Sequence, residues 1–458
     1  MIFQSINPAT GIPFKSWSRH TDAEIDNALK RAEASYKQWS TQAYPVKADL
    51  LLNLARGLRQ NADKLARLAT EEMGKPIKQS LGEVEKSATL CEYYAENGLE
   101  HLQSKYVKMP NGSGEVYYQP LGTVFCIMPW NYPYWQVLRC VVPSLLLGNN
   151  VVLKHAPNVI GCASALQEVF DSVEGASGLF QHVIADNDQA GSIIKDDRII
   201  GVALTGSERA GSAVAAIAGG ALKKCVLELG GSDPFVVLAD ADMDVAVQAV
   251  ITSRFGNAGQ VCIAAKRILV DASIEADFTQ RLVAKTKSLS VGNPDLEATD
   301  MGPMARQDLR DELHTQVKNS ISLGATLLTG GNIIEGDGYY YAPTVLTDIP
   351  VNAPVLCQET FGPVAAICSF KDIEEAIALS NNTPYGLSAS IWTQDSVAAE
   401  KLTKGLNCGN VFINSMSFSD PRLPFGGVKK SGFGRELSSF GVHEFANVKS
   451  VYSHGKER

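Results

Sequence analysis

The feature that most constrains the fold is an alternation of short apolar runs with amphipathic segments after residue 120. The strand-like runs "TVFCIM", "NVVLKH", "RIIGVALTG" and "CVLEL" are accompanied by helix-like segments such as "NVIGCASALQEVFDSV" and "SERAGSAVAAIAGGA". A second series begins near "DPFVVL" and runs to "NVFIN". Such alternation is typical of a parallel α/β sheet. The sequence therefore predicts two α/β units joined near residue 230.

The segments outside this alternation predict helices before the first unit and strands at its borders. Residues 22–102 carry apolar side chains three and four positions apart, and Gly74 before Lys75-Pro76 marks a helix end. "GEVYYQP" predicts a strand ahead of the first unit. "NVKSVYS", near the C-terminus, predicts a lone strand that a partner subunit could pair with.

Composition and charge exclude several classes of protein. The 458 residues are 45% hydrophobic, which is enough for more than one core. The 41 basic and 49 acidic residues give a net charge of -8, so no broad positive surface is expected for nucleic acid or anionic membranes. No apolar run reaches the roughly 18 residues that a membrane span needs. The N-terminus has no basic segment followed by an apolar one, so no signal peptide is expected.

The cysteines are scattered and form no CxxC pair, although the chain has nine of them. This spacing gives no zinc or redox-pair pattern, and we expect no metal site. Free cysteines in a long chain suit a reducing cytosol. We therefore expect a cytoplasmic protein without a nucleic-acid or membrane partner.

One cysteine stands out by its local sequence, "NAGQVCIAAKR", in which Cys262 follows a glycine-containing turn. By default a cysteine between Val261 and Ile263 is a small buried hydrophobe. A turn, however, leaves backbone N–H groups free to face a ligand and exposes the sulfur more than a strand does. Cys262 is therefore the candidate nucleophile.

A carboxylate inside an apolar strand supplies the candidate base. "VLELGG" places Glu228 in such a strand, directly before two glycines. Burying an unpaired carboxylate is costly and raises its pKa, which suits a general base near neutral pH. The alternative is a structural glutamate that has a partner.

Two further motifs follow predicted strands. "PWNYP" holds Asn131 between two stiffening prolines at a strand's carboxyl end, where its amide could donate to an oxyanion. An ordinary turn asparagine is the alternative. "LTGSERAG" gives Gly206 and Ser207 at a helix start, which suits a phosphate. It does not match GxGxxG, so a standard dinucleotide fingerprint is absent here.

Together these motifs carry a resemblance to a known family. In order along the chain stand "INPATG", "EMGKP", "PWNYP", "TGS", "ELGG", "GQVC", "ETFGPV" and "PFGGVKKSG". The ordered set resembles the NAD(P)-dependent aldehyde dehydrogenase superfamily over essentially the whole chain, and within it succinate semialdehyde dehydrogenases most.

The resemblance implies an architecture of three parts. These are a Rossmann-type cofactor-binding domain over residues 1–102 and 120–230, an α/β catalytic domain over 231–445, and a small β oligomerisation arm of 103–119 and 446–458. It also implies a homodimer or homotetramer that acts on a small-molecule aldehyde.

The resemblance assigns the chemistry to three residues. Cys262 matches the nucleophile, which forms a thiohemiacetal and then a thioester. Glu228 matches the base that activates the hydrolytic water. Asn131, with the backbone N–H of Cys262, matches the oxyanion donor.

The cofactor residues also follow from the resemblance. Those that match are Trp130, Lys154, Gly206, Ser207, Glu359 and Phe361, with Glu359 on the nicotinamide ribose. Where the family often has Lys-Pro-x-Glu, this chain has "KHAP", so Pro157 replaces a carboxylate that would hold the adenosine 2′-hydroxyl. A missing carboxylate removes repulsion against a 2′-phosphate, and we expect NAD use with some tolerance of NADP.

The substrate prediction rests on Arg139, which occupies a position where semialdehyde dehydrogenases tend to carry arginine. An arginine fork can pair a distal carboxylate; the alternative is a surface or subunit-contact arginine. Some relatives have a second arginine six residues before the nucleophile, where this chain has Gly256. Arg422, on the loop expected to close the tunnel, is the candidate to compensate. Cys140 stands where a lysine is common, with no predicted consequence.

Three rival functions stay open at this point. A dehydrogenase of uncharged aliphatic or aromatic aldehydes would use Arg139 for something else. A coenzyme-A-acylating enzyme would usually lack a base at the Glu228 position. A binding protein that lost its activity would not need Cys262, Glu228 and Asn131 together.

Overall fold

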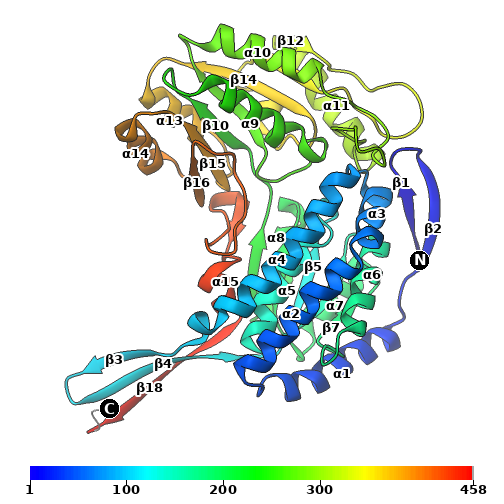
Figure 1. Cartoon of the computed structure of the whole chain (residues 1–458), viewed down its shortest axis with the longest axis vertical. Coiled ribbons are helices and arrows are strands. Elements are labelled where there is room, and N and C mark those ends of the chain that lie inside the picture. The colour runs from blue at the N-terminus through cyan, green and yellow to red at the C-terminus, as the bar shows by residue number, and fades with distance from the viewer. Residues whose placement is uncertain (456–458) are drawn as a thin grey trace.

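Two α/β units and a narrow β-arm make up the computed structural model, which describes residues 1–455 (Figure 1). In Figure 1 the first unit lies below, the second unit lies above, and the arm extends to the lower left. The predicted α/β class and the predicted alternation after residue 120 are confirmed.

The first unit is built on a six-stranded sheet. Its strands, in spatial order, are β17 (Gly432–Phe433), β9 (Lys224–Glu228), β8 (Ile199–Thr205), β5 (Thr123–Met128), β6 (Asn150–His155) and β7 (Phe180–His182). All neighbours are parallel except β17 and β9, which are antiparallel. Val151, Val152 and Leu153 of β6 are fully buried, because a parallel sheet is covered by helices on both faces.

Helices and an N-terminal hairpin surround this sheet. The hairpin is β1 (Ile2–Asn7) and β2 (Ile12–Ser18), and the helices before the sheet are α1 (Asp22–Trp39), α2 (Tyr44–Gln60), α3 (Ala62–Met73) and α4 (Ile77–Leu102). The helices between its strands are α5 (Trp135–Leu147), α6 (Ile160–Ser172), α7 (Asn187–Lys195) and α8 (Glu208–Gly220). The predicted helix end at Gly74 is confirmed, and its φ of 81° is one that glycine adopts without strain.

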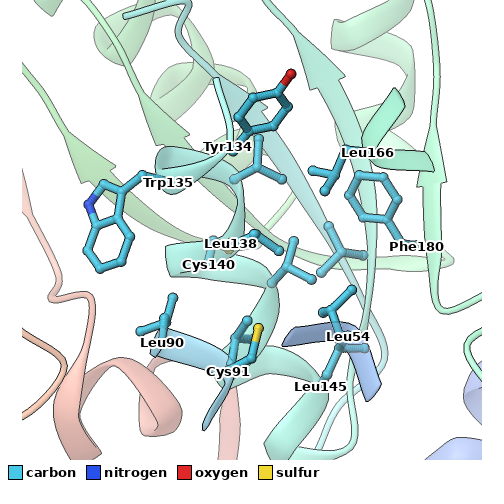
Figure 2. Packing of buried hydrophobic residues seen from close by; sticks show 14 of the residues in the cluster. Leu54, Leu90, Cys91, Tyr134, Trp135, Leu138, Cys140, Leu145, Leu166 and Phe180 are labelled. Atoms are coloured by element: carbon cyan, nitrogen blue, oxygen red, sulfur yellow. The ribbon is translucent and has the colours of Figure 1, made fainter. Parts of the chain in front are cut away.

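The main core of the first unit lies between its helices and its sheet. Figure 2 shows side chains from α2, α4, α5, α6 and β7, and from Tyr134 directly before α5, packed on one another. They include Leu54, Leu90, Cys91, Trp135, Leu138, Cys140, Leu145, Leu166 and Phe180. Every residue of α5 is buried. This helix starts just after "PWNYP", so the core holds the Asn131 segment at its C-terminal side.

The second unit has a seven-stranded sheet. In spatial order its strands are β12 (Thr326–Thr329), β13 (Thr344–Thr347), β14 (Val364–Phe370), β11 (Ala265–Asp271), β10 (Asp233–Val237), β15 (Ser388–Trp392) and β16 (Asn410–Ile413). Only β12 and β13 pair antiparallel. The accompanying helices are α9 (Met243–Phe255), α10 (Glu275–Lys287), α11 (Gln307–Ser322), α12 (Pro354–Cys357), α13 (Ile373–Asn381) and α14 (Ser396–Gly405).

The arm is a three-stranded antiparallel sheet in the order β18-β4-β3. Its strands are β3 (Lys105–Met109), β4 (Gly112–Pro120) and β18 (Ala446–His454). The prediction of a lone C-terminal strand is wrong, because β18 pairs along its full length with β4 of the same chain. Residues 456–458 of the predicted arm lie outside the described residues.

The chain passes between the two units twice, and the two passages lie together. The first follows Glu228 into β10; the second leads from the second unit back to β17, before α15 (Ser438–Glu444). The N–H of Leu229 donates to the carbonyl of Ser431 at 3.0 Å, and the Ser431 hydroxyl donates to the carbonyl of Gly230 at 2.7 Å. Residues 432–433 thus join the first sheet, although they fall within 231–445, the range expected for the catalytic domain. The domain bounds stay a prediction.

No helix within residues 1–455 combines the length and the apolar character that a membrane crossing requires.

Candidate active site

A cavity of about 970 Å³ is lined by residues of both units, at the carboxyl ends of β5, β8 and β9. Ligands of open α/β sheets bind at such carboxyl ends. Seven of the residues singled out from the sequence line it, namely Trp130, Asn131, Gly206, Ser207, Cys262, Glu359 and Phe361. The lining within the described chain does not include Glu228, Lys154, Arg139 or Arg422.

The loop before Cys262 has an unusual backbone. Asn257, Ala258 and Gly259 have φ values of 52°, 50° and 71°, all in the left-handed region that side chains other than glycine rarely adopt. Buried Arg254 holds this loop, since its guanidinium donates to the carbonyls of Gly259 at 2.6 Å and of Gly362. The predicted turn before the nucleophile is present, and the hydrogen bonds from Arg254 hold its conformation.

Asn131 is tied to the same loop through two hydrogen bonds. Its Nδ2 donates to the carbonyl of Gln260 at 2.9 Å, and Nδ2 of Asn257 donates to the Asn131 carbonyl at 2.9 Å. An amide nitrogen has two protons, so one N–H of buried Asn131 is left for a group in the cavity.

The thiol of Cys262 is half-buried on the cavity wall. Burial raises its pKa to about 12, against the positive charges of Arg139 and Lys266, which lower it. At neutral pH the sulfur is therefore protonated, and thiolate chemistry requires a base. Cys357, two positions before Glu359, is exposed and donates to the Val351 carbonyl.

Glu228 ends β9 and is fully buried. Neither of its carboxylate oxygens has a hydrogen-bond partner within residues 1–455. Burial, followed by the neighbouring Glu436 carboxylate, raises its pKa well above the usual carboxyl range, while Arg139 and Arg435 oppose the rise. The pKa shift has the direction predicted from the sequence, as a base near neutral pH requires.

Arg139 lies inside the protein and forms an ion pair with Glu436. Its guanidinium also lies 4.6 Å from the centre of the Phe425 ring. Its side chain is 2% exposed, so the alternative of a surface arginine is wrong. Within the described chain its Nη2 has no hydrogen-bond partner, which leaves one buried donor unused.

Arg422 has a different environment. Its side chain is 73% exposed and its guanidinium binds both carboxylate oxygens of Asp420, at 2.8 and 2.7 Å. This pairing occupies the two guanidinium nitrogens that would otherwise bind a substrate carboxylate. Nothing in the geometry brings Arg422 to Cys262.

The cavity fits a dinucleotide at several points. Ser207 caps α8 by accepting from the N–H of Ala210, which sets the first N–H groups of that helix at the cavity wall. Thr205 lines the same wall, and its buried hydroxyl has no partner among residues 1–455. The rings of Trp130 and Phe361 meet edge to face at 5.7 Å.

The two residues that the sequence associates with the adenosine part of the cofactor do not line this cavity. Lys154 is the next-to-last residue of β6 and lies outside the cavity lining, and burial lowers its pKa. Pro157 lines a second cavity of about 650 Å³ together with Asn158 and Arg306.

Several residues of the site escaped the sequence reasoning. They are Arg254, Asn257, Lys266, Arg435 and Glu436. For Lys266 a signal existed, because a lysine in the apolar strand "AAKRILV" must be buried with partners. Glu436 pairs with a residue almost 300 positions away, and no local pattern indicates that.

Known proteins are similar to this chain over its whole length. The sequence profile of the aldehyde dehydrogenase family matches residues 1–451. The succinate semialdehyde dehydrogenase Sad of Escherichia coli, named for NAD(P)+, is 49% identical over 98% of this chain and 97% of its own. A probable succinate-semialdehyde dehydrogenase of Synechocystis, named for NADP+, is 44% identical over 99% and 100%.

A solved structure agrees with this. The succinic semialdehyde dehydrogenase of Streptococcus pyogenes, in complex with NADP+, superposes with a TM-score of 0.95 at 35% identity, covering 99% of this chain and 100% of that one. A match this extensive, added to a cavity that joins a turn-borne cysteine to a helix start, means that the chain belongs to the aldehyde dehydrogenase family.

Proposed function

We propose that this chain oxidises succinate semialdehyde, or a similar aldehyde bearing a carboxylate, to the acid with NAD or NADP. One observation carries the substrate class, namely the buried and unused Nη2 of Arg139, close enough to Cys262 for its charge to lower the thiol pKa. The relatives of this chain named as succinate semialdehyde dehydrogenases point to the same substrate.

In the first step Cys262 loses its proton, for which Glu228 is the base, and the thiolate attacks the aldehyde carbon. The carbonyl oxygen gains the negative charge of a thiohemiacetal. The free N–H of Asn131 and the backbone N–H of Cys262 are the donors for this oxyanion. Losing one such donor typically costs ~10²–10³ in rate.

NAD or NADP, when bound, accepts the hydride. Trp130, Gly206, Ser207, Glu359 and Phe361 are the residues that would hold it. Glu228 then releases the thiol proton to solvent. Once the acyl group is a thioester on Cys262, the ionised Glu228 takes a proton from water, and the resulting hydroxide displaces the thiolate and releases the acid. A thiolate suits both steps because it is a good nucleophile and a good leaving group.

Use of both cofactors is proposed on two grounds. By the family resemblance, Pro157 stands where a carboxylate would repel a 2′-phosphate. The relative from E. coli is named for NAD(P)+, and that of Streptococcus pyogenes was solved with NADP+.

A homodimer or homotetramer in the cytoplasm is also proposed. The arm carries exposed Tyr106, Val107, Val448 and Val451, which a second copy would cover. All nine cysteines are free, as suits a reducing compartment.

Oxidation of uncharged aldehydes is the second candidate. The ion pair of Arg139 with Glu436 favours it, because a neutralised guanidinium has less need of a substrate carboxylate. Arg422 remains a weaker candidate for the carboxylate, given its pairing with Asp420.

Steady-state rates on paired aldehydes separate the two candidates. Each pair has the same chain length and differs only in a terminal carboxylate, and each is run with NAD and with NADP. We expect the carboxylate member to have the higher kcat/KM. Equal values within the pairs would favour the second candidate, and no turnover of any aldehyde would refute the proposal.

A further inference from the structure

Lys266 is a buried cation beside the nucleophile, with no role in the steps above. It is the second residue of β11, four positions after Cys262, and its side chain is fully buried. A buried ammonium needs all of its protons bound to acceptors. Its Nζ donates to the carbonyls of Gly231 at 2.5 Å and Cys262 at 2.7 Å, and to Oε1 of Glu359 at 2.8 Å.

The three acceptors belong to three separate parts of the site. Gly231 lies on the passage from Glu228 to the second unit, Cys262 is the nucleophile, and Glu359 lines the cavity. One ammonium group thus joins segments that are distant in the sequence. Two of these acceptors belong to the nucleophile and to a residue that lines the cavity, so the anchor made by Lys266 acts on the site itself.

Lys266 also determines how Glu359 is oriented. Oε1 of Glu359 accepts from Lys266 and from the N–H of Gly231 at 3.0 Å, while Oε2 has no hydrogen bond within residues 1–455. A side chain added at Gly230 would come within 2.3 Å of Oε2. One carboxylate oxygen is therefore fixed by the protein, and the other is left for a ligand hydroxyl.

We propose that Lys266 is the positioning residue that sets Glu359 for the cofactor ribose and, through the same ammonium group, fixes the main chain of Cys262. The inference rests on the proposed function, because it takes NAD(P) as the ligand of the cavity. The positive charge of Lys266 also lowers the pKa of the Cys262 thiol, which favours thiolate formation. A neutral residue here would weaken cofactor binding and slow the reaction of the thiol together.

The neighbouring residue supplies a matched control. Arg267 is buried in the same strand and also donates to three acceptors, the carbonyls of Ser232 at 2.8 Å, Leu379 at 2.7 Å and Ser380 at 2.7 Å. None of them lines the cavity of the described chain. Lys266→Met and Arg267→Met therefore remove equivalent structural anchors and differ in what those anchors hold.

The first measurement is the dissociation constant of NADPH from the full-length enzyme, by its fluorescence and without aldehyde. We expect Lys266→Met to raise it by at least about tenfold, as for loss of a charge-assisted hydrogen bond, and Lys266→Arg to recover part of that. In a Glu359→Gln background the same substitution should have little further effect. Arg267→Met, or Arg267→Lys if that variant does not fold, should bind as the wild type does.

The second measurement is alkylation of Cys262 by iodoacetamide across pH, quantified on the peptide that contains it. We expect Lys266→Met to be alkylated more slowly than the wild type at each pH, while the Arg267 variant reacts at the rate of the wild type. Unchanged NADPH binding and an unchanged alkylation rate in Lys266→Met would overturn the inference. Failure of the wild type to bind either NADH or NADPH would instead refute the proposed function, so the two failures are distinguishable.

Discussion

Substituting Arg139 by leucine tests the substrate class most directly. The proposed contact is a hydrogen bond from a charged donor, Nη2 of Arg139, to the substrate carboxylate. Such bonds contribute about 1.5–3 kcal/mol. Since 1.36 kcal/mol corresponds to a factor of ten, we expect loss of this bond alone to lower kcat/KM for succinate semialdehyde by about 10- to 150-fold.

The same substitution has an effect on every aldehyde. Among the charges that lower the pKa of the Cys262 thiol, Arg139 is the first, so its loss makes the thiolate scarcer whatever the substrate. The informative quantity is therefore a ratio: kcat/KM for succinate semialdehyde divided by that for an uncharged aldehyde of equal length. That ratio should fall by about the 10- to 150-fold that the hydrogen bond supplies.

Stability needs its own control, because Arg139→Leu leaves Glu436 without its partner. Removing one member of a buried ion pair costs about 3–5 kcal/mol. Adding Glu436→Gln removes the orphaned charge, and the double variant should regain thermal stability while its substrate ratio stays low. If both aldehydes lose activity equally, or if the double variant recovers the ratio, Arg139 serves only as the counter-ion of Glu436.

Three further predictions concern the chemistry and the core. Glu228→Gln should slow the burst of reduced cofactor seen in stopped flow, because the thiol loses its base, and should lower steady-state kcat by ~10²–10⁴ with a flatter rise with pH. Asn131→Ala should lower kcat by ~10²–10³ with a smaller change in KM, measured by steady-state rates. Asp233, whose pKa burial raises from 3.8 to about 6, binds a proton more tightly in the folded chain. Its contribution to the unfolding free energy therefore falls by up to about 3 kcal/mol as pH rises through that window; Asp233→Asn should abolish this fall in urea titrations between pH 4 and 7.

The sequence predicts many of the strands, but it does not predict all of the pairs that they form. Apolar runs such as "NVVLKH" coincide with β6, because a strand buried on both faces needs apolar residues throughout. The pairing of β18 with β4 was not accessible, since the two strands are more than 300 residues apart. β18 is largely exposed, and the residue pattern of such a strand does not indicate which strand it pairs with.

The site was predictable to the extent that it lies in ordered motifs. Cys262, Asn131 and Glu359 stand in such motifs, and the fold brings them to one cavity. The environment of Arg139 was not predictable, because its partner Glu436 is brought close only by the return of the chain to the first sheet. The same holds for Lys266, whose three acceptors come from segments that meet only in the folded chain.

The two adjoining passages at Gly230 and Ser431 restrict how the molecule can move. Because they are hydrogen-bonded to each other, they join the two sheets directly beside Glu228. The units are joined again elsewhere, where the N–H of Ile77 donates to the carbonyl of Pro294 at 2.8 Å and Nε2 of Gln79 donates to that of Asp300 at 3.2 Å. Two separate attachments leave the units less freedom to turn against each other than one would, which favours a constant separation of the base and the thiol.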